Sequence, residues 1–222
     1  MQLNSDFSRS VRIPNSEHRW IASPQTGVER VMLDRIGGEE ARATSLVRYA
    51  KGSSFPKHTH PLGEEILVLD GTFSDDSGDY PAGWYLRNPP GSAHRPHSVE
   101  GALIFVKLRQ MHSAQTDSLR IDTNSQEGWQ ERDGYDVREL YRNCAEQVSM
   151  VRLKKDVPMP ATMQGGAEIL VVSGALREAS QRHEARSWIR LPPGEPSHLY
   201  AESNGATVYL KTGHLGESPF ID

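Results

Sequence analysis

The sequence has few of the features that mark secreted or membrane-spanning proteins. Cys144 is the single cysteine among 222 residues, so no disulfide can form within the chain, and a reducing cytoplasm is the expected compartment. The apolar runs are short, and one of the longest, residues 102–106, is far below the length of a membrane span. The first residues show no basic segment followed by an apolar one, so no secretory signal is expected.

Charge and motifs exclude further classes. The chain carries 25 Lys and Arg against 29 Asp and Glu, a net charge of -4, which gives no general attraction for nucleic acid or for anionic membranes. It contains no glycine-rich phosphate loop and no G-x-S-x-G motif, which argues against nucleotide binding and against the common serine hydrolases.

The pattern of apolar residues predicts an all-β protein. Short runs of Val, Ile, Leu, Tyr and Phe alternate with turns of Gly, Pro, Asp and Asn, and no segment has a long helical stripe. Two successive sets of short, evenly spaced strands favour two tandem barrels of the jelly-roll kind.

An internal repeat supports two copies of one fold. Residues 65–68 (EILV) recur at 168–171, and residues 89–91 (PPG) recur at 192–194, both 103 positions further along (65 to 168, 89 to 192). The polar segment 113–126 separates the copies.

We therefore expect a metal-binding domain at 1–115 and a degenerate domain at 116–222 that lacks the metal ligands. When the two copies are aligned, the second copy has other residues at most of the positions of the metal ligands. Ala161 and Met163, or Thr162 and Gln164, replace His58 and His60; Ala167 replaces Glu64; and Ser197 or His198 replaces His94.

The strongest functional signal consists of His58, His60, Glu64 and His94. They lie in the patterns G-x5-H-x-H-x3-E-x6-G and G-x5-P-x-G-x2-H, some twenty residues apart. Three imidazoles and a carboxylate are a ligand set for a divalent transition metal. In a strand, residues 58, 60 and 64 share one face, whereas Glu65 faces the other way, so alternation selects Glu64 as the fourth ligand.

Other polar residues near these motifs are not expected to bind the metal. His97 is close to His94 in sequence but fits a position at the rim. The cluster of Asp75, Asp76 and Asp79 is predicted to be a solvated turn, because it lacks the spacing of a calcium loop. Cys144 is predicted to be a small buried apolar residue.

The two motifs resemble the conserved motifs of the cupin superfamily. The wider run from His58 to His94 is similar to the cupin-like domain of the ChrR type, which forms the C-terminal part of ChrR anti-sigma factors. This resemblance spans most of residues 20–110 and, weakly, the repeat. It implies that His58, His60, Glu64 and His94 bind one metal ion per chain, with zinc expected and iron, manganese or nickel as alternatives.

The resemblance implies a role in the regulation or sensing of oxidative stress. An extracytoplasmic-function (ECF) sigma factor or another regulatory protein would be the partner, with a small ligand near the metal. Separately from the resemblance, strands such as residues 65–69 are apolar on both faces, which favours cover by the other domain or by a second chain in a homodimer. However, ChrR anti-sigma factors hold the sigma factor with a separate helical zinc domain that carries an H-x3-C-x2-C motif. This sequence has no such motif.

The alternative is a cupin-type metal-dependent dioxygenase that acts on a small ketone or diketone. Trp84 and Tyr85 lie between the two motifs and are candidates to line its pocket. Arg87, Lys107 and Arg109 are candidates to pair with an anionic substrate.

Overall fold

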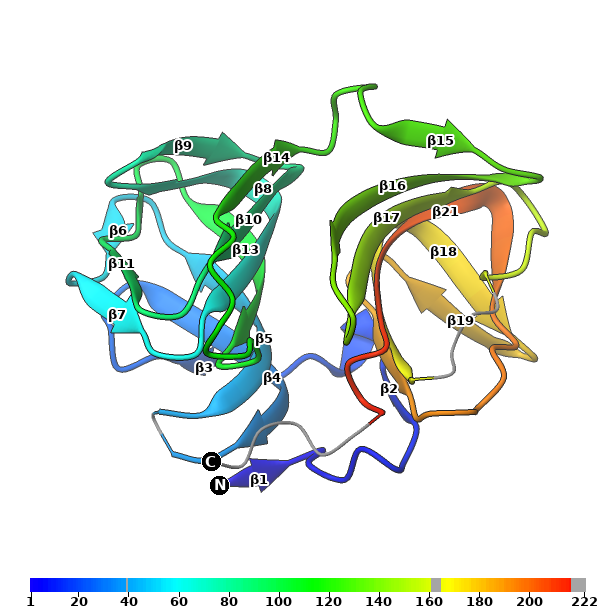
Figure 1. Cartoon of the computed structure of the whole chain (residues 1–222), viewed down its shortest axis with the longest axis horizontal. Helices are drawn as coiled ribbons and strands as arrows, with labels where there is room; N and C mark the ends of the chain where they lie inside the picture. The colour runs from blue at the N-terminus through cyan, green and yellow to red at the C-terminus, as the bar shows by residue number, and fades with distance from the viewer. Residues whose placement is uncertain (39, 161–164, 217–222) are drawn as a thin grey trace. The chain divides into compact units, whose positions relative to one another are not determined.

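The protein is built almost entirely from β-strands and turns (Figure 1). The computed structural model describes residues 1–38, 40–160 and 165–216. In this part of the chain, the one helical element is the 3-10 helix η1 (Asn15–Glu17), and no helix is long and apolar enough to cross a membrane. The all-β prediction is therefore confirmed.

The chain forms two compact units. The first comprises Met1–Ser5 and Arg19–Ser125, and the second comprises Asp6–His18 and Gln126–Asp222.

The first unit contains a large antiparallel sheet with the strand order β1-β4-β5-β13-β8-β10-β14 and several short additional strands. Its strands are β1 (Gln2–Leu3), β3 (Ile21–Ala22), β4 (Val28–Ile36), β5 (Arg42–Tyr49), β6 (Ser53–Ser54), β7 (His58–His60), β8 (Glu64–Asp75), β9 (Gly78–Pro81), β10 (Trp84–Asn88), β11 (Ser92–His94), β12 (His97–Ser98), β13 (Ala102–Leu108) and β14 (Leu119–Asp122).

The second unit repeats this arrangement, with the order β15-β16-β17-β21-β18-β20-β2. Its strands are β2 (Val11–Ile13), β15 (Trp129–Glu131), β16 (Tyr135–Arg142), β17 (Gln147–Leu153), β18 (Ala167–Glu178), β19 (Gln181–Glu184), β20 (Trp188–Leu191) and β21 (Tyr200–Thr212). Strands of the two units correspond position by position, which confirms two tandem barrels.

A glycine marks the same bend in both copies. Gly71 in β8 and Gly174 in β18 have φ angles of +67° and +71°, which other residues rarely adopt. A Cβ atom at Gly71 would lie 2.1 Å from the carbonyl oxygen of Gly101, and one at Gly174 would lie 2.2 Å from that of Gly205. The repeat therefore preserves a close approach of two backbones that only glycine allows.

The structure divides the chain at a different place from the sequence. Strand β14, beyond the expected boundary at residue 115, pairs with β10 of the first unit (Leu86 opposite Arg120). Strand β2, near the N-terminus, pairs with β20 of the second unit. Each of these edge strands has only three or four residues, too few to show a period of their own.

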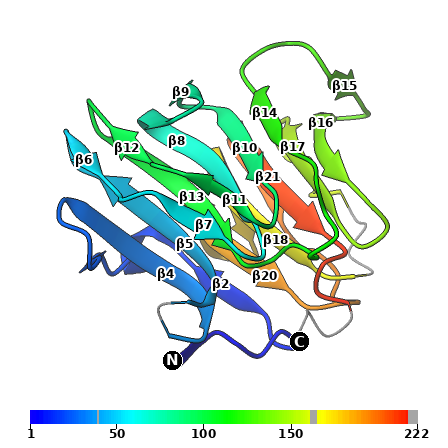
Figure 2. The same ribbon diagram turned by 60° about the vertical axis from the view of Figure 1, so that its left-hand side comes forward.

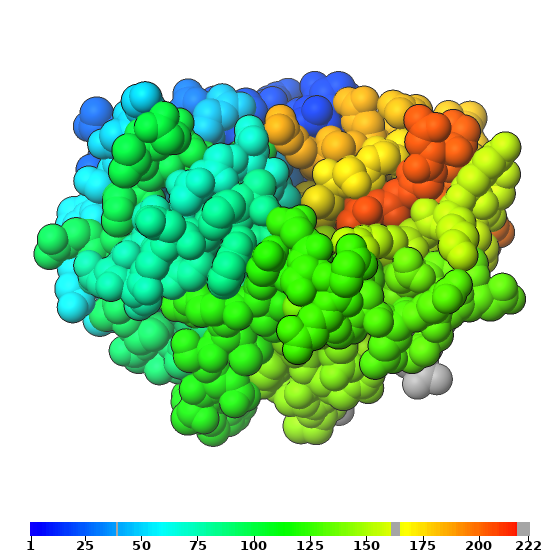
Figure 3. All heavy atoms as spheres, turned by 90° about the horizontal axis from the view of Figure 1, so that it is seen from above, coloured from blue at the N-terminus to red at the C-terminus, as the bar shows by residue number. Residues whose placement is uncertain are grey.

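Each unit has its own apolar core, which includes Val28, Ile66 and Ile104 in the first and Val151, Ile169 and Val208 in the second. Figure 2 shows the strands of each unit curving around this interior. Figure 3 shows the heavy atoms of the chain as spheres, coloured by residue number as in Figure 1.

The opposite face of each large sheet carries a row of buried charges. In the first unit, Glu65 lies on β8 between Lys107 of β13 and Arg87 of β10, and its carboxylate is 3.2 Å from the Arg87 guanidinium. All three residues are at most 3% exposed. The same residue types recur in the same register in the second unit, at Glu168, Lys211 and Arg190.

Candidate metal centre

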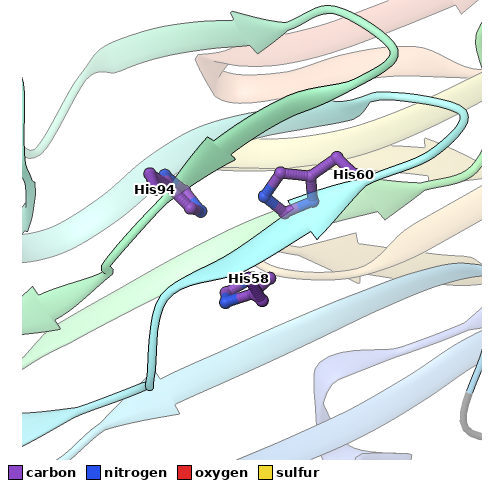
Figure 4. Close-up of side chains that lie close together, drawn as sticks. All are labelled: His58, His60 and His94. Carbon is purple, nitrogen blue, oxygen red and sulfur yellow. The ribbon is translucent and has the colours of Figure 1, made fainter.

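Two short antiparallel strands bring the three histidines together. In the pairing of β7 with β11, His94 lies directly opposite His58, and His60 is two residues further along the same face. The potential ligand atoms of the three side chains lie within 4.8 Å of one another. Figure 4 shows the three rings gathered around one small space.

Hydrogen bonds orient two of the rings. Nδ1 of His58 is 2.9 Å from the carbonyl oxygen of Pro56, which fixes its proton there and leaves Nε2 as the available ligand atom. Nδ1 of His94 is 3.1 Å from Oδ2 of Asp75, with the same consequence. Outer partners of this kind are typical of histidines that bind metals.

Burial and charge set the protonation of the site. Burial lowers the pKa of His60, so its ring is neutral near pH 7 and keeps a lone pair for a metal. For His94, burial lowers the pKa, but the Asp75 hydrogen bond and the Glu64 charge outweigh burial and the net shift is upward. The pKa of Asp75 is lowered; burial opposes this shift, and hydrogen bonds from His94 and Ser77 produce it.

The site fits a metal because its inward-facing nitrogen atoms lack hydrogen-bond partners. Nε2 of His60 and Nε2 of His94 are buried and accept or donate no hydrogen bond within the described residues. Oε2 of Glu64 is 3.5 Å from the first and 3.4 Å from the second. Buried polar atoms are normally satisfied, so two such atoms beside a carboxylate are explained by an ion between them. The structure thus brings together all four residues singled out in the sequence.

Glu64 reaches the site as alternation predicts. Residues 61–63 form a turn between β7 and β8, and Glu64, the first residue of β8, is 6% exposed. Asn88, opposite it on β10, donates a hydrogen bond of 2.8 Å to Oε2. Glu65 turns to the other face and pairs with Arg87.

A second set of residues, missed in the sequence, supports the ligands. The prediction that Asp75 lies in a solvated turn was wrong, because β8 extends to this residue and buries its side chain beside His94. Arg120 of β14 donates hydrogen bonds to Oδ1 of Asn88, at 2.7 Å, and to the hydroxyl of Tyr80, at 3.1 Å. Arg120 falls outside the domain expected at 1–115, although it stabilises the metal centre of that domain.

Replacement of Asp75 tests this supporting role. We expect Asp75→Asn to weaken metal binding by about 10–100-fold, because the amide no longer holds the His94 ring with a charge-assisted hydrogen bond. Titration against a competing chelator measures the affinity. The matched control is Asp76→Asn, which changes the exposed neighbour and leaves the affinity unaltered. Equal affinities in the two variants would contradict the role of Asp75.

The metal centre opens into a cavity of about 800 Å³ within the first unit. His58, His60 and Glu64 form part of its wall. Apolar side chains, among them Val28, Tyr49, Phe55, Ile104 and Val106, make up much of the remainder. A cavity of this size accommodates a small organic molecule in contact with the metal ligands.

Most of the residues that the sequence suggested for a substrate pocket do not line this cavity. Tyr85 is fully buried on the face that carries Glu65, and Trp84 packs against the core and Tyr80. Arg87 pairs with Glu65, and Lys107 donates a hydrogen bond to Thr44. Neither cation contributes to the cavity wall, whereas Arg109 does.

The second unit differs at the corresponding place. Residues 161–164, the counterparts of His58 and His60, lie outside the described residues. Ala167 begins β18 where Glu64 begins β8, and His198 is exposed, whereas His94 is buried. The absence of a metal from this unit stays a prediction. Cys144 is exposed in this unit, so the prediction that it is buried was wrong.

A comparison with known families finds a match that covers most of the first unit. Residues 8–112 match the family model of the ChrR cupin-like domain. The barrel fold and the histidine group are consistent with this match, which indicates a cupin domain of the ChrR type within residues 8–112. No curated protein sequence matches it.

Several solved structures share the fold over most of their length. A candidate dioxygenase from Nostoc punctiforme has a TM-score of 0.71 at 11% identity, covering 97% of this chain and 87% of its own. The bacterial pirin YhhW from Escherichia coli, in complex with nickel(II), has a TM-score of 0.63 at 13% identity, covering 92% and 99%. The 11S allergen from Cocos nucifera has a TM-score of 0.69 at 8% identity, covering 93% and 90%. Proteins this diverse establish the fold and leave the activity open.

Proposed function

We propose that the first unit binds one divalent transition metal through His58, His60, Glu64 and His94 and uses it to oxidise a small organic molecule with molecular oxygen. The observation that supports this most is that three of these four side chains also line the cavity. A six-coordinate ion with four protein ligands keeps two positions for exogenous molecules. A small ketone or diketone is the substrate class that we infer.

The side chains of the cavity have separate tasks in this activity. Apolar residues such as Val28 and Ile104 exclude water from the bound molecule. Burial, with a smaller contribution from the Glu64 charge, raises the pKa of Tyr49, so its hydroxyl stays protonated and can donate a hydrogen bond. When bound, the metal would supply a Lewis acid that polarises an oxygen atom of the ligand. The likeness to a candidate dioxygenase and to a nickel-bound pirin is compatible with this proposal.

Regulation is the second candidate, and the ChrR family match of residues 8–112 supports it. Here zinc would hold the site, and a small ligand in the cavity would alter contacts with an ECF sigma factor or another regulatory protein in the cytoplasm. Four protein ligands on a tetrahedral zinc ion leave no open position, as in structural zinc sites. The two functions therefore differ in the metal and in its free coordination positions.

Elemental analysis combined with oxygen uptake tests both functions. We expect about one divalent metal ion per chain, and its loss in His94→Ala, since Nε2 of this residue faces the site. Iron, manganese or nickel, together with oxygen consumption on addition of a diketone or a hydroxyacetophenone, would support the dioxygenase. Zinc without oxygen consumption would support regulation. Equal metal content in wild type and His94→Ala would contradict the site itself.

A further inference from the structure

Two buried hydroxyl groups of strand β5 face the cavity of the first unit. Ser45 and Tyr49 both line its wall, and the two residues are 5% and 6% exposed. They lie four residues apart on one face of β5, and Val47, which also lines the cavity, lies between them. Their Cα atoms are therefore about 13 Å apart along the strand. Strand β5 thus presents a hydroxyl, an apolar side chain and a second hydroxyl in a row.

Neither hydroxyl makes a hydrogen bond within the residues that the structure describes. By contrast, the hydroxyl of Thr44, on the opposite face of β5, accepts hydrogen bonds from Nζ of Lys107 at 3.0 Å and from Nε2 of Gln110 at 3.1 Å. Buried polar groups are normally satisfied, and one that is left unmet costs free energy. For Ser45 and Tyr49, the partner that remains is a molecule in the cavity, either water or a ligand.

The surrounding residues hold both hydroxyls in place. The ring of Tyr49 packs edge-on against Phe55 and Phe73, at centroid distances of 5.9 and 5.8 Å. Ser45 lies within a strand that is hydrogen-bonded on both sides, to β4 and to β13. Burial raises the pKa of Tyr49, so the phenol keeps its proton and remains a donor. Donors that are fixed before a ligand arrives lose little entropy when they bind it.

We propose that Ser45 and Tyr49 select the molecule bound in this cavity, by hydrogen bonds to two oxygen groups at the ends of an apolar body that lies against Val47. A site built to hydrogen-bond an oxygen atom rejects the analogue that lacks it, because its own polar groups are then left unpaired. This inference rests on the proposed function, because it takes the cavity to be the ligand site. It narrows the ligand class from ketones in general to molecules with oxygen groups at both ends.

Three probes with one apolar body test the inference on the zinc-loaded protein. Ethylbenzene has no oxygen, acetophenone has one oxygen group, and 4-hydroxyacetophenone has oxygen groups at both ends of its ring. Zinc has no redox chemistry, so the probes are not consumed during the titration. We expect the affinity to rise in this order by about 2–10-fold at each step, the effect of one net hydrogen bond. Ligand-observed NMR titrations give the affinities.

Substitutions that remove only the hydroxyl groups test the two residues directly. Tyr49→Phe and Ser45→Ala should each lower the affinity for 4-hydroxyacetophenone by about 2–10-fold and leave that for ethylbenzene unchanged. Neither hydroxyl has a partner within the described residues, so neither substitution breaks a hydrogen bond of the fold. The matched controls are Tyr200→Phe and Ser54→Ala, which remove the same groups from residues that do not line the cavity. All three affinities should be unchanged in these controls.

Three outcomes would overturn the inference. They are equal affinities of the wild type for 4-hydroxyacetophenone and ethylbenzene, no binding of any of the three probes, and a preference that survives in full in Tyr49→Phe or in Ser45→Ala. Oxygen uptake by the iron-loaded protein separates this inference from the proposed function. Without uptake, a preference that still depends on both hydroxyls contradicts only the oxidation. Uptake that is the same in the wild type and in both variants, for all three probes, contradicts only the selection by the hydroxyls.

Discussion

His60→Ala is expected to reduce metal affinity by at least about 100-fold, since it removes a ligand and not merely an outer partner. Nε2 of His60 makes no hydrogen bond within the described residues, so the substitution breaks no structural hydrogen bond of that atom. The metal should therefore be lost while the fold is kept. Elemental analysis of the purified variant, with hydrogen exchange to follow its strands, measures both effects.

The comparison for this variant is His198→Ala in the second unit, where the histidine is exposed. Its metal content should equal that of the wild type. The second unit has its own apolar core, so its hydrogen exchange should be unchanged in His60→Ala. A metal content that stays the same in His60→Ala, or falls in His198→Ala, would show that the ligands are assigned to the wrong residues.

Gly71→Ala should destabilise the first unit by at least about 3 kcal/mol. The new Cβ would lie 2.1 Å from the Gly101 carbonyl oxygen, a backbone atom held between paired strands, in addition to the strain of φ +67°. Hydrogen exchange of β8 and β13 measures the loss, because it follows the first unit separately.

Gly52→Ala is the matched control for this effect. Gly52 has a similar φ of +75°, but a Cβ there meets no atom within 4 Å. Its replacement should cost about 1 kcal/mol, the conformational part alone. Gly174→Ala should reproduce the large effect in the second unit, where the close atom is the Gly205 carbonyl oxygen. Similar losses for Gly71→Ala and Gly52→Ala would contradict the importance of the close approach.

The part of the metal centre that follows from local geometry could be predicted from the sequence. His58, His60 and Glu64 follow the alternation of strands, and the proline-glycine corner returns His94 to them. The residues that hold these ligands could not be predicted in this way. Asp75 and Arg120 reach the site through strand pairings between distant segments, which no local pattern specifies.

Some residue patterns in the sequence indicate structural roles that the metal motifs do not. Arg30 alternates with Val28 on β4, and both residues line the cavity of the first unit. The buried row of Lys107, Glu65 and Arg87 recurs in the second copy. A charged residue preserved at corresponding positions of a repeat indicates a shared structural task, and Arg87 and Lys107 are therefore poor candidates for binding a substrate.

The pairing of the early strand β2 with β20 of the second unit has a consequence for the order in which the protein folds during synthesis. The ribosome produces β2 among the first residues, but its partner β20 is complete only at Leu191. Strand β2 therefore has no partner strand until most of the chain has been made. The first unit needs only residues up to Asp122 of β14 and can close much earlier. Strand β2 is thus made early but is among the last to reach its place, and a ribosome stalled before residue 188 would leave it exposed.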